Sequence, residues 1–283
     1  MTPRRRLIVM LNVAKGWLLL IIPTALISLL GWKIGGYRIA ILFGGSIVLL
    51  AAALYAYADR IVMGMLGARE LLQAESPALH STLERLSSRA GIVKPRLYVL
   101  GDSYPRAFSA GRGAGGGSGV AVSVGLVGVA SPAELEGVLA HELAHIRHRD
   151  VLLQSVVVIL ATAIVEASRI GGFLQRPLLF VLAPIAAAFV HLMLSPKREL
   201  LADRLAADLC DSPHGLADAL VRLEQAMSLV GFEANPASEP LYTTNPFALE
   251  GIASLFDTHP PIGERVRRLR ELDPDWRAKL HAA

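Results

Sequence analysis

Apolar residues concentrate in four blocks of this chain, and polar residues fill the segments that follow the second and the fourth. The blocks cover residues 17–32, 39–58, 151–165 and 177–195. A membrane-spanning helix needs about 20 mostly apolar residues, with roughly 17–25 as the usual range. The second and fourth blocks meet this length, the first meets it if Lys15 reaches the interface, and the third is short. We predict four transmembrane helices, with two spans plus an interfacial hairpin as the alternative.

The distribution of basic residues predicts which side of the membrane the polar segments occupy. Arg4–Arg6 precede the first block, and residues 59–150 and 196–283 carry ten Lys or Arg each. Basic residues favour the cytoplasmic side. We therefore predict an uncleaved signal anchor, both termini in the cytoplasm, and two cytoplasmic catalytic segments. The predicted units are an N-terminal hairpin, a first catalytic segment, a second hairpin and a second catalytic segment: 1–58, 59–150, 151–195 and 196–283.

The overall composition agrees with a membrane protein. Of the 283 residues, 53% are hydrophobic and 18% are charged, against about a quarter charged in ordinary soluble domains. The mean hydropathy is +0.47. The net charge of +4 suits an anionic membrane surface, and no nucleic-acid-binding motif accompanies it. The single cysteine, Cys210, excludes an internal disulfide and a multi-cysteine zinc cluster.

The first polar segment predicts a helix followed by strands. Residues 66–90 are expected to be helical with an interruption near Ser76–Pro77, and residues 96–100 form a short strand. Residues 107–127 have strand-like ends around a glycine-rich middle. This middle lacks the Gly-Lys-Ser/Thr ending of a phosphate-binding loop, so we expect a mobile hairpin tip and no nucleotide.

Ser-Pro pairs mark the helices that follow. Ser131 begins a capping box with Glu134, so a helix starts there and carries the histidines further along. Ser195–Pro196 and Ser212–Pro213 start two more helices. Residues 258–272 predict a turn and a basic terminal helix.

The sequence HELAH at residues 141–145 predicts a catalytic metal site. His141 and His145 are four residues apart, so their imidazoles project from one helix face and can share a zinc ion. Glu142 lies about 100° around the helix from His141, where it can act as a general base without binding the metal. The alternative is a histidine- and arginine-rich cap at a membrane surface.

A catalytic zinc site needs a third protein ligand and an open position. Glu199, one turn beyond the fourth apolar block, fits this role. Asp203 follows on the same helical face and can orient a ligand imidazole. Taken alone, these acids could instead pair with Arg198 or Arg204 on a solvated face.

Three other polar residues near these motifs are expected to lie outside the metal site. His148 and Asp150 are predicted to be residues of the membrane interface, since His141, His145 and Glu199 already complete the ligand set. His191 lies within the fourth apolar block and is predicted to pack there.

Several segments in order resemble the membrane-bound M48 zinc metalloproteases, including the heat-shock proteases of that family. The matching residues are HELAH, RELLAD at 198–203 and FDTHPPIGERVRRL at 256–269, and AFSAG at 107–111 resembles a strand near the active site. The order of apolar blocks matches as well. Arg106 and Ala110 depart from the family's usual asparagine and threonine, which leaves details of substrate binding open.

This resemblance implies a mainly α, membrane-embedded fold with about four transmembrane helices and a cytoplasmic zincin-like (gluzincin) α+β domain with a small sheet. It implies one Zn²⁺ per chain, held by His141, His145 and Glu199, with Glu142 as the catalytic base. It also implies that His259 stabilises the transition-state oxyanion, with packing of a turn as the alternative.

The implied function is zinc-dependent endoproteolysis of misfolded or damaged membrane proteins in a bacterial inner membrane, with membrane proteins or unfolded polypeptides as substrates. We weigh two alternatives: a CAAX-type prenyl-protein endopeptidase of the same clan, and a non-hydrolytic zinc-binding scaffold or sensor. An intact Glu142 argues against the scaffold, because a structural zinc site has no use for that acid.

Overall fold

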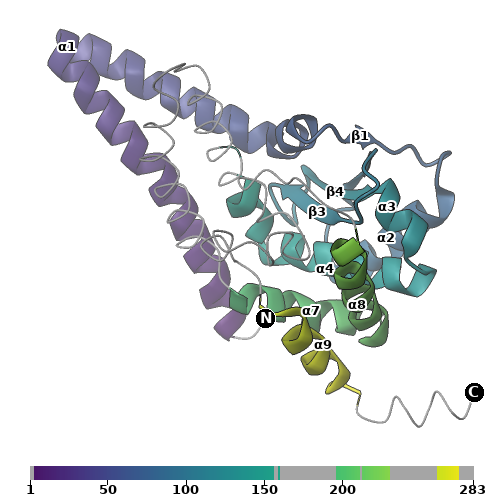
Figure 1. Cartoon of the computed structure of the whole chain (residues 1–283). Helices are drawn as coiled ribbons and strands as arrows, with labels where there is room; N and C mark the ends of the chain where they lie inside the picture. The colour runs from purple at the N-terminus through teal and green to yellow at the C-terminus, as the bar shows by residue number, and fades with distance from the viewer. Residues whose placement is uncertain (1–2, 156–158, 160–195, 211, 230–259, 274–283) are drawn as a thin grey trace, which may run out of the picture.

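A long helical hairpin forms the N-terminal part of the structure. The computed structural model describes residues 3–155, 159, 196–210, 212–229 and 260–273. Helix α1, Pro3–Met65, is interrupted at Gly35 and Gly36, where the backbone leaves helical geometry. Gly36 has φ 69°, a conformation that glycine adopts without steric cost. The interruption divides α1 into two legs that meet in a sharp bend (Figure 1).

The second leg of α1 is apolar and largely exposed. Within the described residues, Ser28–Met65 is the stretch that is long and apolar enough to cross a membrane. Leu42 and Leu49, for example, expose more than half of their surface. Most of the third apolar block and all of the fourth lie outside the described residues, so the four-span arrangement and the division into four units stay predictions.

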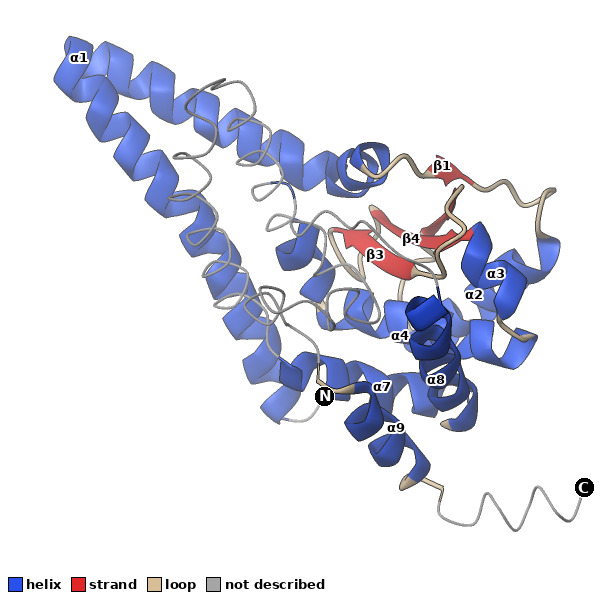
Figure 2. Ribbon diagram, in the orientation of Figure 1, coloured by secondary structure: helices blue, strands red, loops and turns tan. Residues whose placement is uncertain are grey.

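A small mixed sheet lies beside the end of α1. Its strands run in the order β1-β2-β4-β3, and β3 forms one edge (Figure 2). Strands β1 and β2 are antiparallel, β2 and β4 are parallel, and β3 and β4 form an antiparallel hairpin. The strands are β1 Arg69–Glu70, β2 Arg96–Leu100, β3 Ala107–Gly111 and β4 Ser118–Ser123.

The two faces of the sheet pack against different partners. Phe108, Ala110 and Ala121 join Val62 and Met63 of α1 in one cluster. Residues at the alternating positions, Ala107, Val120 and Val122, join the main core with the later helices. Successive side chains of a strand point to opposite faces of the sheet, so one set of alternating residues packs against α1 and the other set packs against the later helices.

Helix α4, Pro132–His148, lies at the centre of the polar part of the structure. The predicted capping box is confirmed: Ser131 Oγ accepts from the Glu134 N–H, and Glu134 accepts from the Ser131 N–H. The other helices of this part are α2 Pro77–Ala90, α3 Val124–Val129, α7 Pro196–Cys210, α8 His214–Leu229 and α9 Ile262–Arg270.

Two glycines allow α4 and α8 to approach closely. A Cβ at Gly137 would lie 2.5 Å from the backbone nitrogen of Leu216, and one at Gly215 would lie 2.4 Å from the carbonyl oxygen of Ala133. Neither distance is compatible with a side chain. This contact holds the start of α4 rigidly, and the histidines follow on the same helix.

Two sequence predictions about local structure are wrong. The segment before α2 is not helical, because Gly67 has φ 69° and the chain then pairs as β1 with the edge of β2. The second strand of the hairpin ends at Ser123 and does not reach residue 127. Ser123 Oγ caps the short helix α3 by accepting from the Leu126 N–H. The prediction of a mainly helical protein with a small sheet is confirmed.

Candidate metal centre

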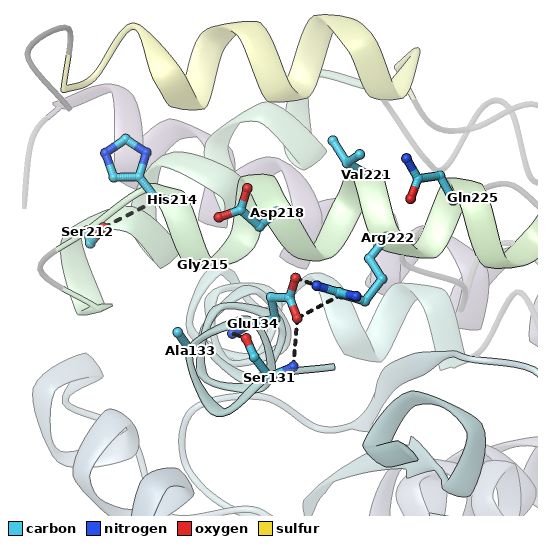
Figure 3. A pocket seen from close by; sticks show the side chains of 10 residues that line it. All are labelled: Ser131, Ala133, Glu134, Ser212, His214, Gly215, Asp218, Val221, Arg222 and Gln225. Carbon is cyan, nitrogen blue, oxygen red and sulfur yellow. Dashed lines mark hydrogen bonds and ion pairs between the residues drawn. The ribbon is translucent and has the colours of Figure 1, made fainter. Parts of the chain in front are cut away.

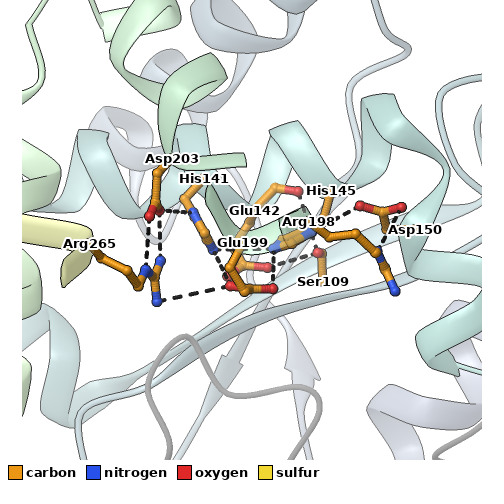
Figure 4. A network of polar contacts seen from close by, with 9 residues as sticks. All are labelled: Ser109, His141, Glu142, His145, Asp150, Arg198, Glu199, Asp203 and Arg265. Carbon is orange, nitrogen blue, oxygen red and sulfur yellow. Dashed lines mark hydrogen bonds and ion pairs between the residues drawn. The ribbon is translucent and has the colours of Figure 1, made fainter. Parts of the chain in front are cut away.

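The HELAH residues lie on the buried side of α4. His141, Glu142 and His145 expose at most 4% of their surface. Helix α7 crosses this face and brings Glu199, which is 5% exposed, to the two imidazoles (Figure 4). Two histidines and a carboxylate from separate helices therefore meet in a water-poor environment.

The donor atoms of these three residues form a compact triangle. The Nε2 atoms of His141 and His145 are 3.2 Å apart. Glu199 Oε2 lies 3.4 Å from His141 Nε2, and Glu199 Oε1 lies 3.4 Å from His145 Nε2. Ligands placed tetrahedrally at about 2.0–2.1 Å from a zinc ion are separated by roughly 3.3 Å. The triangle matches three corners of such a tetrahedron.

Each imidazole has a carboxylate at its other nitrogen. His141 Nδ1 lies 2.9 Å from Asp203 Oδ1, and His145 Nδ1 lies 3.4 Å from Asp150 Oδ2. A carboxylate at Nδ1 holds a proton on that atom, so Nε2 is the nitrogen that can bind a metal once it has lost its own proton. Both histidines direct Nε2 to the centre of the triangle.

An arginine lies behind each carboxylate. Arg265 of α9 donates from Nε and Nη2 to the two oxygens of Asp203, at 2.9 and 2.7 Å. Arg198 Nε lies 3.0 Å from Asp150 Oδ1. These cations offset part of the cost of burying the acids.

Buried charge shifts the pKa values of three of these groups. Burial lowers the pKa of His145, but the carboxylates of Glu199 and Asp150 raise it to about 10. Burial raises the pKa of Asp203, but Arg265 lowers it to about 2. Burial likewise raises the pKa of Asp150, and Arg198 and His145 lower it further than burial raises it. The raised pKa of His145 reflects a negative potential from the nearby carboxylates, which favours a cation at this position, whereas the lowered values of the two aspartates reflect their arginines.

The donor set fits a resident metal ion. The three donor residues are the group of the described chain whose ligand atoms all lie within 4.8 Å of one another. Two imidazole nitrogens and one carboxylate oxygen are ligands that zinc accepts in catalytic sites. The negative potential compensates the charge of a divalent ion.

Glu142 lies beside this triangle on the same helix. Its Oε2 accepts a hydrogen bond of 2.7 Å from Ser109 Oγ of the edge strand β3. Figure 4 shows the Glu142 carboxylate next to that of Glu199. A carboxylate in this position can accept a proton from a water molecule near the donor triangle.

One sequence prediction about this region is wrong. Asp150 is not an interface residue: it is 1% exposed and contacts His145. Arg149 ends α4 in the left-handed conformation, with φ 60°, and a new helical stretch begins at Asp150. Asp150 lies five residues after His145 in the sequence, but the turn at Arg149 that places it beside this histidine was not visible there.

Sequence reasoning also missed Ser109 and Arg265. Both reach the site from elements distant in the chain, β3 and α9. The segments that contain these two residues were noticed in the sequence only because they resemble those of a known family. His259 and His191 lie outside the described residues, and their predicted roles stay predictions.

An open hollow of about 490 Å³ lies at the other end of α4, away from the histidines. Ser131, Glu134, His214 and Arg222 are among the residues that line it (Figure 3). Arg222 Nε donates to both oxygens of Glu134, at 2.8 and 3.0 Å. Because this carboxylate is already bonded by Arg222 and by the helix cap, we assign the chemistry to the histidine centre.

The chain is similar to known proteins over most of its length. The model of peptidase family M48 matches residues 73–273. The "Protease HtpX homolog" of Pelotomaculum thermopropionicum is 39% identical, over 93% of this chain and 99% of that protein. The proteins of the same description from Acidiphilium cryptum and Pyrococcus abyssi are 40% and 38% identical, over 92% and 88% of this chain. The crystal structure of Saccharomyces mikatae Ste24p aligns with a TM-score of 0.48 and 18% identity, over 95% of this chain and 66% of that one.

Proposed function

The chain belongs to peptidase family M48 and is a membrane metalloprotease, and from this premise we propose that it is a zinc-dependent endopeptidase of membrane proteins. The observation that carries the proposal is the triangle of His141, His145 and Glu199 with Glu142 beside it. The family implies a metal, and the geometry of the donors supports zinc in particular.

Three residues of the site are proposed metal ligands, and two further carboxylates orient the histidines among them. His141, His145 and Glu199 would hold the zinc, which when bound acts as a Lewis acid toward the scissile carbonyl. Asp203 and Asp150 keep the two imidazoles in the ligating tautomer. These contacts orient the ligands before any substrate arrives.

Glu142 is the proposed general base and acid. Its carboxylate takes a proton from the attacking water, whose oxygen forms a bond to the carbonyl carbon. The same proton then passes to the amide nitrogen as the carbon–nitrogen bond breaks. Burial of Glu142 excludes competing bulk water from this exchange.

The side of β3 opposite β4 is the proposed binding site for the substrate backbone, since β3 is an edge strand of the described sheet. Ser123 N–H bonds to Arg106 O, and Arg112 N–H bonds to Gly117 O, so even-numbered residues of the strand face β4. By the alternation of an antiparallel ladder, the backbone groups of Ser109 point away from β4. An extended peptide can add there as a further strand.

The apolar leg of α1 supports substrates that reside in the membrane. This leg belongs to the stretch Ser28–Met65, which is long and apolar enough to cross a membrane, and its end packs against the sheet that carries β3. We propose that misfolded or damaged membrane proteins are cleaved, in a bacterial inner membrane, with the catalytic part and both termini in the cytoplasm. Fusions of a cytoplasm-specific reporter to each terminus test that orientation.

The variant Glu142→Gln tests the catalytic assignment. We expect a zinc content near that of wild type and a loss of cleavage of at least about 100-fold on a model membrane protein, as for removal of a general base. Glu136→Gln is the matched control, because Glu136 lies on the same helix and pairs with Arg85 near the surface. Cleavage by Glu142→Gln at the wild-type rate would overturn the assignment.

A further inference from the structure

Ser109 occupies a position that joins the edge strand to the catalytic helix. It is the central residue of β3, Ala107–Gly111, and is 2% exposed. Its neighbours Phe108 and Ala110 point toward α1, so its own side chain points to the opposite face, toward α4. A hydroxyl in such a position needs a hydrogen-bond partner.

That partner is the Glu142 carboxylate. Ser109 Oγ lies 2.7 Å from Glu142 Oε2 and 3.4 Å from the Glu142 carbonyl oxygen. An ionised carboxylate only accepts, so the serine hydroxyl donates. The shorter contact has the length of a charge-assisted O–H···O bond, and the single proton therefore goes to Oε2.

We propose that Ser109 is a positioning residue for the general base: its hydroxyl holds Glu142 Oε2 and so fixes the orientation of the carboxylate that exchanges the proton with water. This inference rests on the proposed function. A glutamate side chain has three rotatable bonds, and α4 alone does not restrict where its carboxylate points. The bond from β3 selects one orientation.

The same residue also contacts the proposed substrate strand. The Ser109 backbone groups point to the side of β3 away from β4, where Gly111 N–H, two residues along, donates to Ser155 Oγ at 3.0 Å. A peptide that pairs with β3 at Ser109 thus lies next to the residue that orients the base. The position of the scissile bond and the orientation of the carboxylate are set by one rigid element.

The test compares Ser109→Ala with Ser109→Thr in the zinc-loaded, full-length protein, using a peptide-bond reporter in a model membrane substrate. Loss of a hydrogen bond to a charged group predicts a fall in kcat of about 10–100-fold for Ser109→Ala. KM and zinc content should stay within about twofold, because the backbone edge and the metal ligands are unchanged. Ser109→Thr keeps the hydroxyl and should recover at least a third of the wild-type kcat.

Ser118→Ala is the matched control. Ser118 is another buried serine of the same hairpin, and its hydroxyl bonds to Gly113 instead of the catalytic helix. We expect its kcat within about twofold of wild type. If the threonine variant does not fold, Ser109→Cys replaces it: a size-matched side chain with a weak donor should resemble Ser109→Ala in kcat.

Two results would overturn the positioning role. One is a kcat of Ser109→Ala within twofold of wild type. The other is a raised KM together with a lower zinc content and a lower thermal stability, which marks a purely structural role. Either result combined with an inactive Glu142→Gln leaves the proposed function intact. An active Glu142→Gln would instead remove the proposed function itself.

Discussion

The two histidines are supported by similar contacts that are built in different ways. On one side, Asp203 is bonded by two nitrogens of the fully buried Arg265 and lies 2.9 Å from His141. We call these three residues the α9 arm. On the other side, Asp150 Oδ1 lies 3.0 Å from Arg198 Nε of α7, and Asp150 Oδ2 lies 3.4 Å from His145, and we call these three the local arm because Asp150 directly follows α4.

The difference shows how distant and neighbouring segments contribute to one site. The α9 arm depends on a helix that docks from the C-terminal part of the chain, and its geometry is bidentate and short. In the local arm, Asp150 follows the left-handed turn at Arg149 directly after α4, only Arg198 comes from another helix, and the contacts are longer. Bidentate arginine–carboxylate pairs are more directional and stronger than single contacts. We therefore expect the α9 arm to carry more of the stability and of the metal affinity.

The largest expected effect is on stability, in Arg265→Ala. This variant leaves the Asp203 carboxylate buried and uncompensated, and breaking a buried pair in this way costs about 3–5 kcal/mol of unfolding free energy. Arg198→Ala removes the longer 3.0 Å contact with Asp150 and should cost less, about 1–3 kcal/mol. Denaturant unfolding of the detergent-solubilised protein gives both values.

Arg267→Ala is the control for this pair of variants. Arg267 lies on the same helix as Arg265, but its ion pair with Glu271 is exposed, so its removal should have little effect. An unfolding free energy that falls more in Arg198→Ala than in Arg265→Ala would contradict the ranking of the two arms.

The next effect is on zinc affinity. Replacement of a carboxylate that orients a ligand histidine typically weakens metal binding by about 10–100-fold, and we expect this for Asp203→Asn. Asp150→Asn should have a smaller effect, because its 3.4 Å contact is near the limit of a hydrogen bond. Competition with a chelator of known affinity measures both. Asp218→Asn, an exposed acid that pairs with Arg270, serves as the control.

The outcome of the affinity experiment separates two views of the site. Weaker binding by Asp203→Asn than by Asp150→Asn supports the α9 arm as the stronger one. Weaker binding by Asp150→Asn would instead mean that the turn at Arg149, and not the docking of α9, sets the ligand geometry.

The smallest effect concerns a third carboxylate–arginine pair, Glu134–Arg222, which lies on α4 away from the metal centre. Burial raises the pKa of Glu134, but bonds from Ser131 N–H and Arg222 lower it below its usual 4.5. The stability that this pair contributes is therefore present at neutral pH and is lost as the pH falls below about 4.5 toward the lowered pKa. Glu134→Gln should flatten this acid decrease in the thermal midpoint.

At neutral pH the same variant should cost less than about 1 kcal/mol, in the range of helix capping contacts, and should leave zinc affinity unchanged. A change in zinc affinity would mean that the two ends of α4 are coupled, and that the arms cannot be compared independently of the cap.

The sequence by itself determined the features that depend on local periodicity. The spacing of His141 and His145 places both on one face of any helix, and the capping box at Ser131 starts that helix in the right place. The apolar stretches predicted the helical hairpin of α1, whose bend lies at Gly35–Gly36. These interactions join residues within one or two helical turns, so the pattern is enough to predict them.

Only the tertiary structure decided which distant groups surround the histidines. The proximity of Glu199 depends on how α7 crosses α4, and that of Arg265 on the docking of α9. Ser109 reaches Glu142 only because β3 is the edge strand on the α4 side of the sheet. Asp150 turns inward because of one left-handed residue. Such contacts follow from the packing of whole elements, and no local pattern of hydrophobic and polar residues encodes them.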